Sequence, residues 1–372
     1  MATSNEFSFC TICGMMLETG FFEQRLNGVD DSDWLSNTTA LSGPHWGYLE
    51  ERPKAIRITD EAITRYVAVA RCSTRTLQLL PSGRIVQPQN GYDLDEPYNY
   101  DPVAPQEWFF GIHAACEEIA NRVMQTSRKT HIRSIGDLWM TLDRRCTKTF
   151  LKHSSATSNF LPFAPENQPG EPPRVGLGRY YIPSGCIYRL SNERDGWWDE
   201  DPLQIPDLTV SLLSGLEQVN PQNGNLQFRS HLASLPQGIW NEIKDLVLSS
   251  VLLGPTPVEC NYLMPQSFWR EVFLQIPFLW DLDQGIIDKK SLEAELEGNE
   301  WNWEKITRQI ATPVKPPTYS EEEGEWIEWD YQDVGLVVPP GLNNRRRIWQ
   351  IVEDMYPDDV DGLEDTWKEW EE

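Results

Sequence analysis

The sequence of 372 residues contains no hydrophobic run long enough to cross a membrane. Its longest run, near 246–253, is far shorter than the roughly 20 apolar residues of a spanning helix. The first residues also lack the basic cluster and apolar stretch of a signal peptide. We therefore expect a protein of the cytoplasm or nucleus with no membrane partner. In such a compartment the seven cysteines are expected to be thiols or metal ligands rather than disulfides.

Positive charge is scarce. Lys and Arg number 32 against 57 Asp and Glu, which gives a formal net charge of −25 at pH 7. Proteins that bind nucleic acid usually present a basic face to the phosphates. The excess of negative charge therefore argues against DNA, RNA or anionic lipid as a partner.

Signatures of catalysis are absent from the sequence. It has no His-Glu-x-x-His motif, no Gly-x-x-x-x-Gly-Lys phosphate loop and no Gly-x-Ser-x-Gly elbow. Gly176-Leu177-Gly178 is only half of a dinucleotide fingerprint, and the five histidines do not form a cluster in sequence. We therefore expect that the chain is not an enzyme.

The chain nevertheless has the composition of a folded protein, with 40% hydrophobic residues. Helical spacing occurs at 60–70, 112–125, 134–145, 235–253, 265–273 and 292–310, and a hairpin is expected at 76–87. These patterns predict an α+β fold in four parts. A mixed α/β module over 1–150 is followed by a Pro-rich irregular connection over 151–225. A helical unit over 226–284 and a helical C-terminal part with an acidic tail over 285–372 complete the chain.

The acidic tail has two interpretations. Residues 319–372 contain 17 acidic and 4 basic residues, which is typical of a solvated, partly disordered segment. Interleaved tryptophans, among them Trp329 and Trp349, favour a tail that docks on a basic partner or back onto the protein itself.

Two short motifs carry metal-binding residue types. Cys10-Thr11-Ile12-Cys13-Gly14 lets two thiolates face one ion, because glycine permits the tight turn. In His113-Ala114-Ala115-Cys116, helical spacing puts the imidazole and the thiolate on one face. Together Cys10, Cys13, His113 and Cys116 predict a structural zinc site, since four protein ligands leave no open position. The alternatives are buried thiols beside a hydrogen-bonded histidine, or a redox-active Cys-x-x-Cys.

A second pattern begins at 234. Ser234 is placed as a helix N-cap and Pro236 lies in the first turn, where its missing N–H costs least. An apolar stripe then follows at spacings of four, four and three, made by Leu235, Ile239, Ile243 and Leu246. A helix this short cannot bury much of itself, so part of its apolar face is expected to meet another surface, either in this chain or in a partner.

This pattern, together with the later Ser267-Phe268-Trp269-Arg270, resembles an F-box. More narrowly, the chain resembles a group of fungal F-box-like proteins that open with Cys-x-x-Cys-Gly and carry a His-x-x-Cys helix. Elements like Trp34-Leu35, Lys54-Ala55-Ile56 and 201–206 come in the same serial order, and a stretch like Asn344–Trp349 completes it. The matches are scattered over most of the chain.

The resemblance implies a substrate-recruiting adaptor of a Skp1–cullin ubiquitin ligase. It implies that Leu235, Pro236, Ile239 and Ile243 face a Skp1-like protein and that Trp269 anchors a later helix, while the rest of the chain binds an unknown protein substrate. Two departures stand out: Gly238 weakens the first helix, and 258–264 lacks the usual leucine–serine–basic run. The alternative is a non-catalytic interaction or structural protein whose degenerate F-box is internal core.

Overall fold

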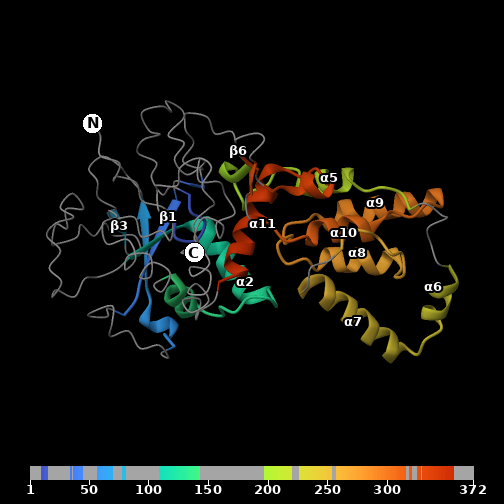
Figure 1. The fold of residues 1–372 in the computed structure, drawn as a ribbon, viewed down its shortest axis with the longest axis horizontal. Helices are drawn as coiled ribbons and strands as arrows, with labels where there is room; N and C mark the ends of the chain where they lie inside the picture. The colour runs from blue at the N-terminus through green and yellow to red at the C-terminus, as the bar shows by residue number, and fades with distance from the viewer. Residues whose placement is uncertain are drawn as a thin grey trace.

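The computed structural model describes residues 10–15, 34–35, 37–44, 57–69, 78–80, 109–142, 197–219, 226–253, 257–315, 318–320, 325–327 and 329–355. A sheet-containing half and a helical half lie on either side of helix α11 (Pro340–Glu353), as Figure 1 shows. The described residues are mostly helical, with one small four-stranded antiparallel sheet, so the predicted α+β class is confirmed. None of the described helices has the length and apolar character needed to span a membrane.

The sheet has the strand order β3-β2-β1-β4, from β1 (Asn37–Ser42), β2 (Thr64–Val69), β3 (Gln78–Leu80) and β4 (Phe109–His113). Strand β1 pairs with β2 and β4, so that Ala40 lies opposite both Tyr66 and Gly111. The expected helix over 60–70 is wrong. Only a 3-10 turn, η2 (Asp60–Ala62), precedes β2, because Tyr66, Val67 and Val69 favour an extended chain that can pair with β1. Strand β3 lies within the expected hairpin, whose remainder is outside the described residues.

Helix α2 (Ala114–Thr126) follows β4 without a loop and buries one face, including Ile119 and Val123. A further helical segment over 135–142 buries Leu138 and Trp139. Both helices were predicted from helical spacing, and the described residues confirm them. They share one apolar core with Cys10, Cys13 and Cys116.

The helical half contains α5 (Leu208–Ser214), α6 (Leu226–Ala233), α7 (Gln237–Leu253), α8 (Gln266–Leu274), α9 (Gln284–Glu297) and α10 (Trp303–Ala311). Helix α10 packs against α8 and also contacts α7, while α5 lies along α9 (Figure 1). The expected single helix over 292–310 is wrong. Gly298 adopts a φ of +71°, and Asn302 starts a new helix by accepting a hydrogen bond from the Lys305 amide.

Short elements complete the described structure: η4 (Trp197–Asp199), the hairpin of β5 (Thr318–Ser320) and β6 (Glu325–Ile327), and η6 (Tyr331–Val334). The predicted boundary at 150 lies outside the described residues, as does the last residue of the predicted connection, 225. The predicted boundary between 284 and 285 falls after the first residue of α9.

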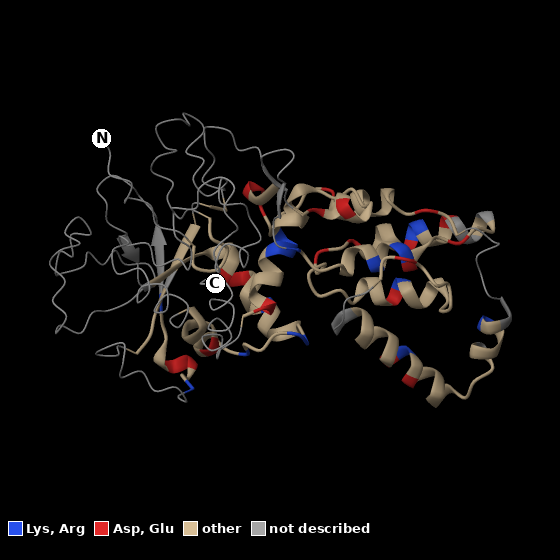
Figure 2. Ribbon diagram, in the orientation of Figure 1, with Lys and Arg blue, Asp and Glu red and all other residues tan. Residues whose placement is uncertain are grey.

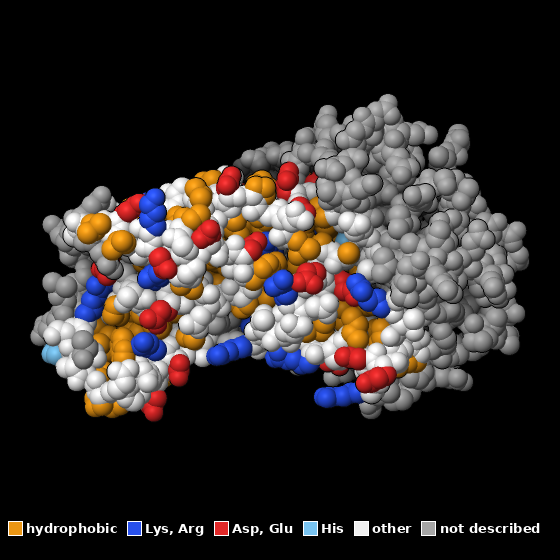
Figure 3. Space-filling model, turned by 180° about the vertical axis from the view of Figure 1, so that it is seen from behind, with side chains coloured by type: hydrophobic (Ala, Val, Ile, Leu, Met, Phe, Trp, Pro, Cys, Tyr) orange, Lys and Arg blue, Asp and Glu red, His pale blue; other side chains and the backbone are white. Residues whose placement is uncertain are grey.

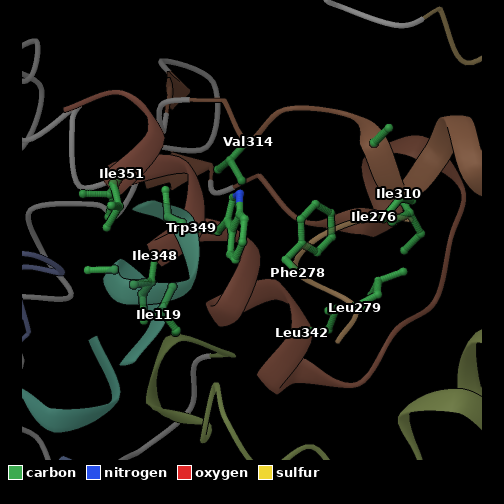
Figure 4. Packing of buried hydrophobic residues seen from close by; sticks show 14 of the residues in the cluster. Ile119, Ile276, Phe278, Leu279, Ile310, Val314, Leu342, Ile348, Trp349 and Ile351 are labelled. Atoms are coloured by element: carbon green, nitrogen blue, oxygen red, sulfur yellow. The ribbon is translucent and has the colours of Figure 1, made fainter. Parts of the chain in front are cut away.

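Helix α11 is the centre of the molecule rather than a solvated tail. Trp349 is 1% exposed and packs on Phe278, with ring centroids 5.9 Å apart, while Ile348 points toward Ile119 of α2 (Figure 4). Trp329 is buried as well. The expectation of a solvated acidic tail is therefore wrong for residues 329–355, which dock onto the protein itself. Residues 356–372 lie outside the described part.

The basic turn of α11 lies between the two halves (Figure 2). Arg345 is fully buried and donates two hydrogen bonds to the carboxylate of Asp281, at 2.6 and 2.7 Å. Its other donors reach the carbonyl oxygens of Pro202, Leu203 and Phe278. One side chain thus ties α11 to two separate loops, which fixes the helix against the helical half.

Candidate functional site

The Cys-x-x-Cys-Gly motif, Cys10–Gly14, forms a tight turn on strand β4. The Cys10 amide donates to the Met15 carbonyl (2.7 Å), and the Gly14 amide donates to the Cys10 carbonyl (2.9 Å). Gly14 adopts a φ of +76°, a conformation that favours glycine. The Thr11 amide donates to the Gly111 carbonyl at 3.0 Å, so the turn is held against the strand that leads to His113.

The second motif lies where β4 becomes α2. His113 is the last residue of the strand, and Cys116 lies in the first turn of the helix. The His113 Nδ1 atom lies 3.4 Å from Cys13 Sγ and 4.0 Å from Cys116 Sγ. All four predicted ligands are fully buried, and their ligand atoms lie within 4.8 Å of one another. The structure therefore brings together Cys10, Cys13, His113 and Cys116.

The electrostatics of this Cys3His group favour a central cation. The amides of Cys13 and His113 point at Cys10 Sγ, at 3.4 and 3.5 Å. Burial raises the pKa of Cys10, but hydrogen bonds from Cys116 and Cys13 and the charge of His113 outweigh it and hold that pKa well below its usual range. Burial alone would lower the pKa of His113, whereas the charges of Cys13 and Cys10 raise it to about 10. A negative sulfur is thus balanced by a positive ring, a role that a divalent ion can take over.

The Cys116 thiol behaves in the opposite way. Burial, together with hydrogen bonds and the charges of Cys10 and Cys13, raises the pKa of Cys116 well above its usual value. Without a cation Cys116 therefore keeps its proton, because a further negative charge in a buried site is unfavourable. A metal ion would release that proton on binding.

Residues outside the predicted set support the group. Arg347 of α11 donates to the Cys13 carbonyl at 2.8 Å and to the Asn344 side chain. The Trp34 ring meets His113 edge-on at 5.0 Å, while its indole N–H donates to the Asp199 carbonyl. Sequence reasoning missed Arg347, because three consecutive arginines in an acidic tail look like solvated charge. The motif itself gives no signal for a contact 334 positions away.

The residues that the F-box resemblance singled out lie in α7 and in the two positions before it. Pro236 and Ile239 are exposed, Ile239 by 48%, whereas Leu235 and Ile243 are half-buried against the core. Leu246, the last residue of the stripe, is 72% exposed. Of the four candidates, Ile239 and Ile243 lie on α7, whereas Leu235 and Pro236 immediately precede it, and only part of the stripe faces the interior. Figure 3 shows hydrophobic side chains gathered over α6 and α7 at the lower left.

The opposite face of α7 holds the helix in place. Trp240 and Val247 pack against the core, Val251 is 3% exposed, and Lys244 lies 3.8 Å from Glu271 of α8. The expected Ser234 N-cap is wrong, because its hydroxyl donates to the His231 carbonyl at the end of α6.

The Ser267–Arg270 stretch lies in α8. Trp269 is 1% exposed there, with the Arg308 guanidinium 4.8 Å from its ring centroid, as expected for an anchoring residue. The aromatic ring is therefore part of the packing between α8 and α10 and is not accessible to a partner.

No protein-family model, no curated protein and no solved structure matches this chain. Function is therefore inferred from the side chains themselves. The buried Cys3His group and the exposed stripe of α7 are the two features that bear on it. They lie in different halves of the molecule and are linked through α11.

Proposed function

We propose that this chain is an F-box-type adaptor that recruits a protein substrate to a Skp1–cullin ubiquitin ligase by binding, without catalysis. The helices α6, α7 and α8 form the unit that meets a Skp1-like protein, and the remaining surface meets the substrate. Such an adaptor acts in the cytoplasm or nucleus, where ubiquitin ligases of this type assemble.

The observation that supports the proposal is the outer face of α7. Ile239 and Leu246, seven residues apart and so on the same side of the helix, are 48% and 72% exposed. Covering a large aliphatic side chain stabilises a complex by roughly 1.5–3 kcal/mol when burial is complete. Two such side chains beside the exposed Pro236 form an apolar strip suited to a partner helix.

The alternative, in which the F-box-like helices are only internal core, fits the other side of α7. Leu235 and Ile243 do pack against the core. An internal role gives no reason, however, for Leu246 to be more exposed than any other hydrophobic residue of α7 whose exposure is described. The outer strip therefore favours the adaptor.

Co-purification with Skp1 tests this function. The full chain is expected to retain Skp1, and an Ile239→Ala, Leu246→Ala double variant is expected to lose it. The matched control is Val337→Ala, because Val337 is 74% exposed but lies outside α6, α7 and α8. If the wild-type chain is folded by circular dichroism and still does not retain Skp1, the adaptor function is refuted.

We also propose that the Cys3His group binds one structural zinc ion. Zinc–sulfur bonds of about 2.3 Å in a tetrahedral site imply sulfur–sulfur distances of about 3.8 Å, close to the spacing of these ligand atoms. Three thiolates and one imidazole form a donor set that prefers zinc over calcium or magnesium. The ion would be held by Cys10, Cys13, His113 and Cys116, and it would supply cross-linking between the turn and α2 rather than chemistry.

Metal analysis of protein purified without chelator is expected to find one zinc per chain. Cys116→Ser is expected to lose the metal, whereas Cys260→Ser is expected to retain it, because Cys260 lies against α10 in the helical half. A fully folded wild-type chain with no bound metal would contradict the zinc proposal.

A further inference from the structure

The segment between α7 and α8 has an unusual course. Residues 257–264, here called the strap, are not helical, although an F-box of the type resembled would place its middle helix there. The strap crosses the start of α10, where the buried carboxylate of Glu304 accepts hydrogen bonds from the amides of Asn261 and Tyr262, both at 2.9 Å. Arg308 pairs with the same carboxylate at 2.8 Å and donates to the Pro257 carbonyl. A buried ion pair therefore fixes both ends of the strap.

Tyr262 lies in a strained conformation within the strap. Its φ is +52°, in the left-handed region that bulky residues rarely adopt. Its hydroxyl accepts a hydrogen bond from the Asn302 side chain at 3.2 Å, and Asn302 is itself buried as the cap of α10. Strain held by surrounding contacts is typical of binding sites. The ring is therefore fixed in position before any ligand arrives.

The strap forms one wall of a pocket of about 400 Å³. Val258, Glu259 and Tyr262 line it from the strap, Asn302 and Lys305 line it from the start of α10, and Glu217 lines the far side. The far side is tied to α10 as well, because the Asn302 amide donates to the Glu217 carbonyl at 2.8 Å. The pocket is therefore preformed by three cross-linked segments, and its volume suits one long side chain.

The charges of the pocket leave one carboxylate in excess. Lys305 pairs with Glu217, with Nζ and Oε1 2.5 Å apart. Glu259 has no ion-pair partner among the residues that the structure describes. An unpaired carboxylate beside a fixed aromatic ring suits a planar cation, which can pair with the carboxylate and stack on the ring. The net charge of −25 also attracts basic segments.

We propose that this pocket binds the side chain of an arginine in an extended segment of a partner protein. The guanidinium pairs with Glu259 and stacks on Tyr262, while its aliphatic stem lies against Val258. This inference deepens the proposed function, since in an adaptor the bound segment belongs to the recruited substrate. Binding itself does not require Skp1.

Titration with the peptide acetyl-Gly-Ser-Gly-Arg-Gly-Ser-Gly-amide tests the pocket. The salt concentration is 0.15 M, at which the Debye length is about 8 Å and attraction between distant charges is screened. Saturable binding is expected, and Glu259→Gln is expected to weaken it about fivefold, the upper range for a solvent-exposed pair. Glu271→Gln is the matched control, because it removes the same charge from the exposed surface of α8. A peptide with citrulline in place of arginine is expected not to bind.

A second measurement locates the peptide. Cys260 also lines the pocket, so bound peptide is expected to slow alkylation of its thiol by iodoacetamide, followed by mass spectrometry of that residue alone. The proposal is overturned if binding does not saturate, if Glu271→Gln weakens it as much as Glu259→Gln, or if the alkylation rate is unchanged at saturation.

The outcomes separate this pocket from the adaptor function. Glu259→Gln is expected to retain Skp1, and the Ile239→Ala, Leu246→Ala variant is expected to retain the peptide. If the wild-type chain binds the peptide but does not retain Skp1, the adaptor function is refuted and the pocket stands. If it retains Skp1 but does not bind the peptide, the pocket is refuted and the adaptor function stands.

Discussion

Replacement of Arg345 by methionine is expected to destabilise the protein strongly. The guanidinium is fully buried and satisfies five acceptors: both oxygens of Asp281 and three backbone carbonyls. It also lies 4.0 Å from the centroid of the Trp280 ring. Methionine fills much of the volume but donates no hydrogen bond, so the three carbonyls and the carboxylate lose their partner together.

The expected cost follows from these contacts. Removing one partner of a fully buried ion pair lowers the free energy of unfolding by about 3–5 kcal/mol. Because the Asp281 side chain is 31% exposed, we expect a loss at the lower end of that range, about 3 kcal/mol. Arg345→Lys keeps the charge but loses the two-pronged contact with Asp281, so we expect a loss of about 2 kcal/mol. Lys244→Met, which breaks the more exposed pair with Glu271, is expected to cost about 1 kcal/mol or less. The loss of stability is therefore expected to be largest for Arg345→Met, smaller for Arg345→Lys and smallest for Lys244→Met.

Equilibrium unfolding in urea, followed by tryptophan fluorescence, measures these differences. Trp349, buried against Phe278, is one of the 16 tryptophans whose surroundings change on unfolding. If Arg345→Met remains within about 1 kcal/mol of the wild-type chain, the range of a surface pair, the central role of the buried arginine is refuted.

Three further predictions concern backbone space, ionisation and the metal. Gly341→Ala is expected to lower the melting temperature, because the added Cβ would lie 2.5 Å from the Asp201 carbonyl oxygen. Gly238→Ala is expected to raise the melting temperature, because its added Cβ meets no atom within 4 Å and alanine favours a helix more than glycine does. Burial raises the pKa of Tyr331, so above about pH 10 the tyrosine loses its proton in the unfolded state before it does so in the folded state. The free energy of unfolding therefore falls there by up to about 1.4 kcal/mol per pH unit. Urea titrations at about pH 9–11 are expected to show a smaller fall for Tyr331→Phe than for the wild-type chain. Arg347→Met is expected to weaken zinc binding about tenfold or more in a chelator competition, and an unchanged zinc affinity would contradict a supporting role for that arginine.

The residues of the Cys3His group were predictable because their arrangement is local. A Cys-x-x-Cys-Gly turn and a His-x-x-Cys helix start each place two ligands without help from the rest of the fold, and only their meeting needed the structure. The segment over 60–70 was not predictable from helical spacing alone. Its apolar residues fit both the helical period of about 3.6 residues and the strand period of two. Pairing of Thr64–Val69 with β1 decides in favour of a strand.

Long-range burial explains the remaining errors. Arg345 and Arg347 have the sequence context of solvated charge, yet each meets backbone carbonyls from distant segments. Nothing in the neighbouring residues encodes those partners. Likewise, the break between α9 and α10 depends on Gly298 in a left-handed conformation, whereas the apolar spacing over 292–310 continues through it.

The contact between Arg347 and the Cys13 carbonyl has a consequence for synthesis. All four residues of the Cys3His group are present once residue 116 has emerged from the ribosome, so the group can close early. Its buried arginine is made more than 200 residues later. Until then the face of α2 around Ile119, which receives Ile348, lacks its cover. We expect nascent chains that stop before 340 to expose this apolar face and to be captured by chaperones even when zinc is present.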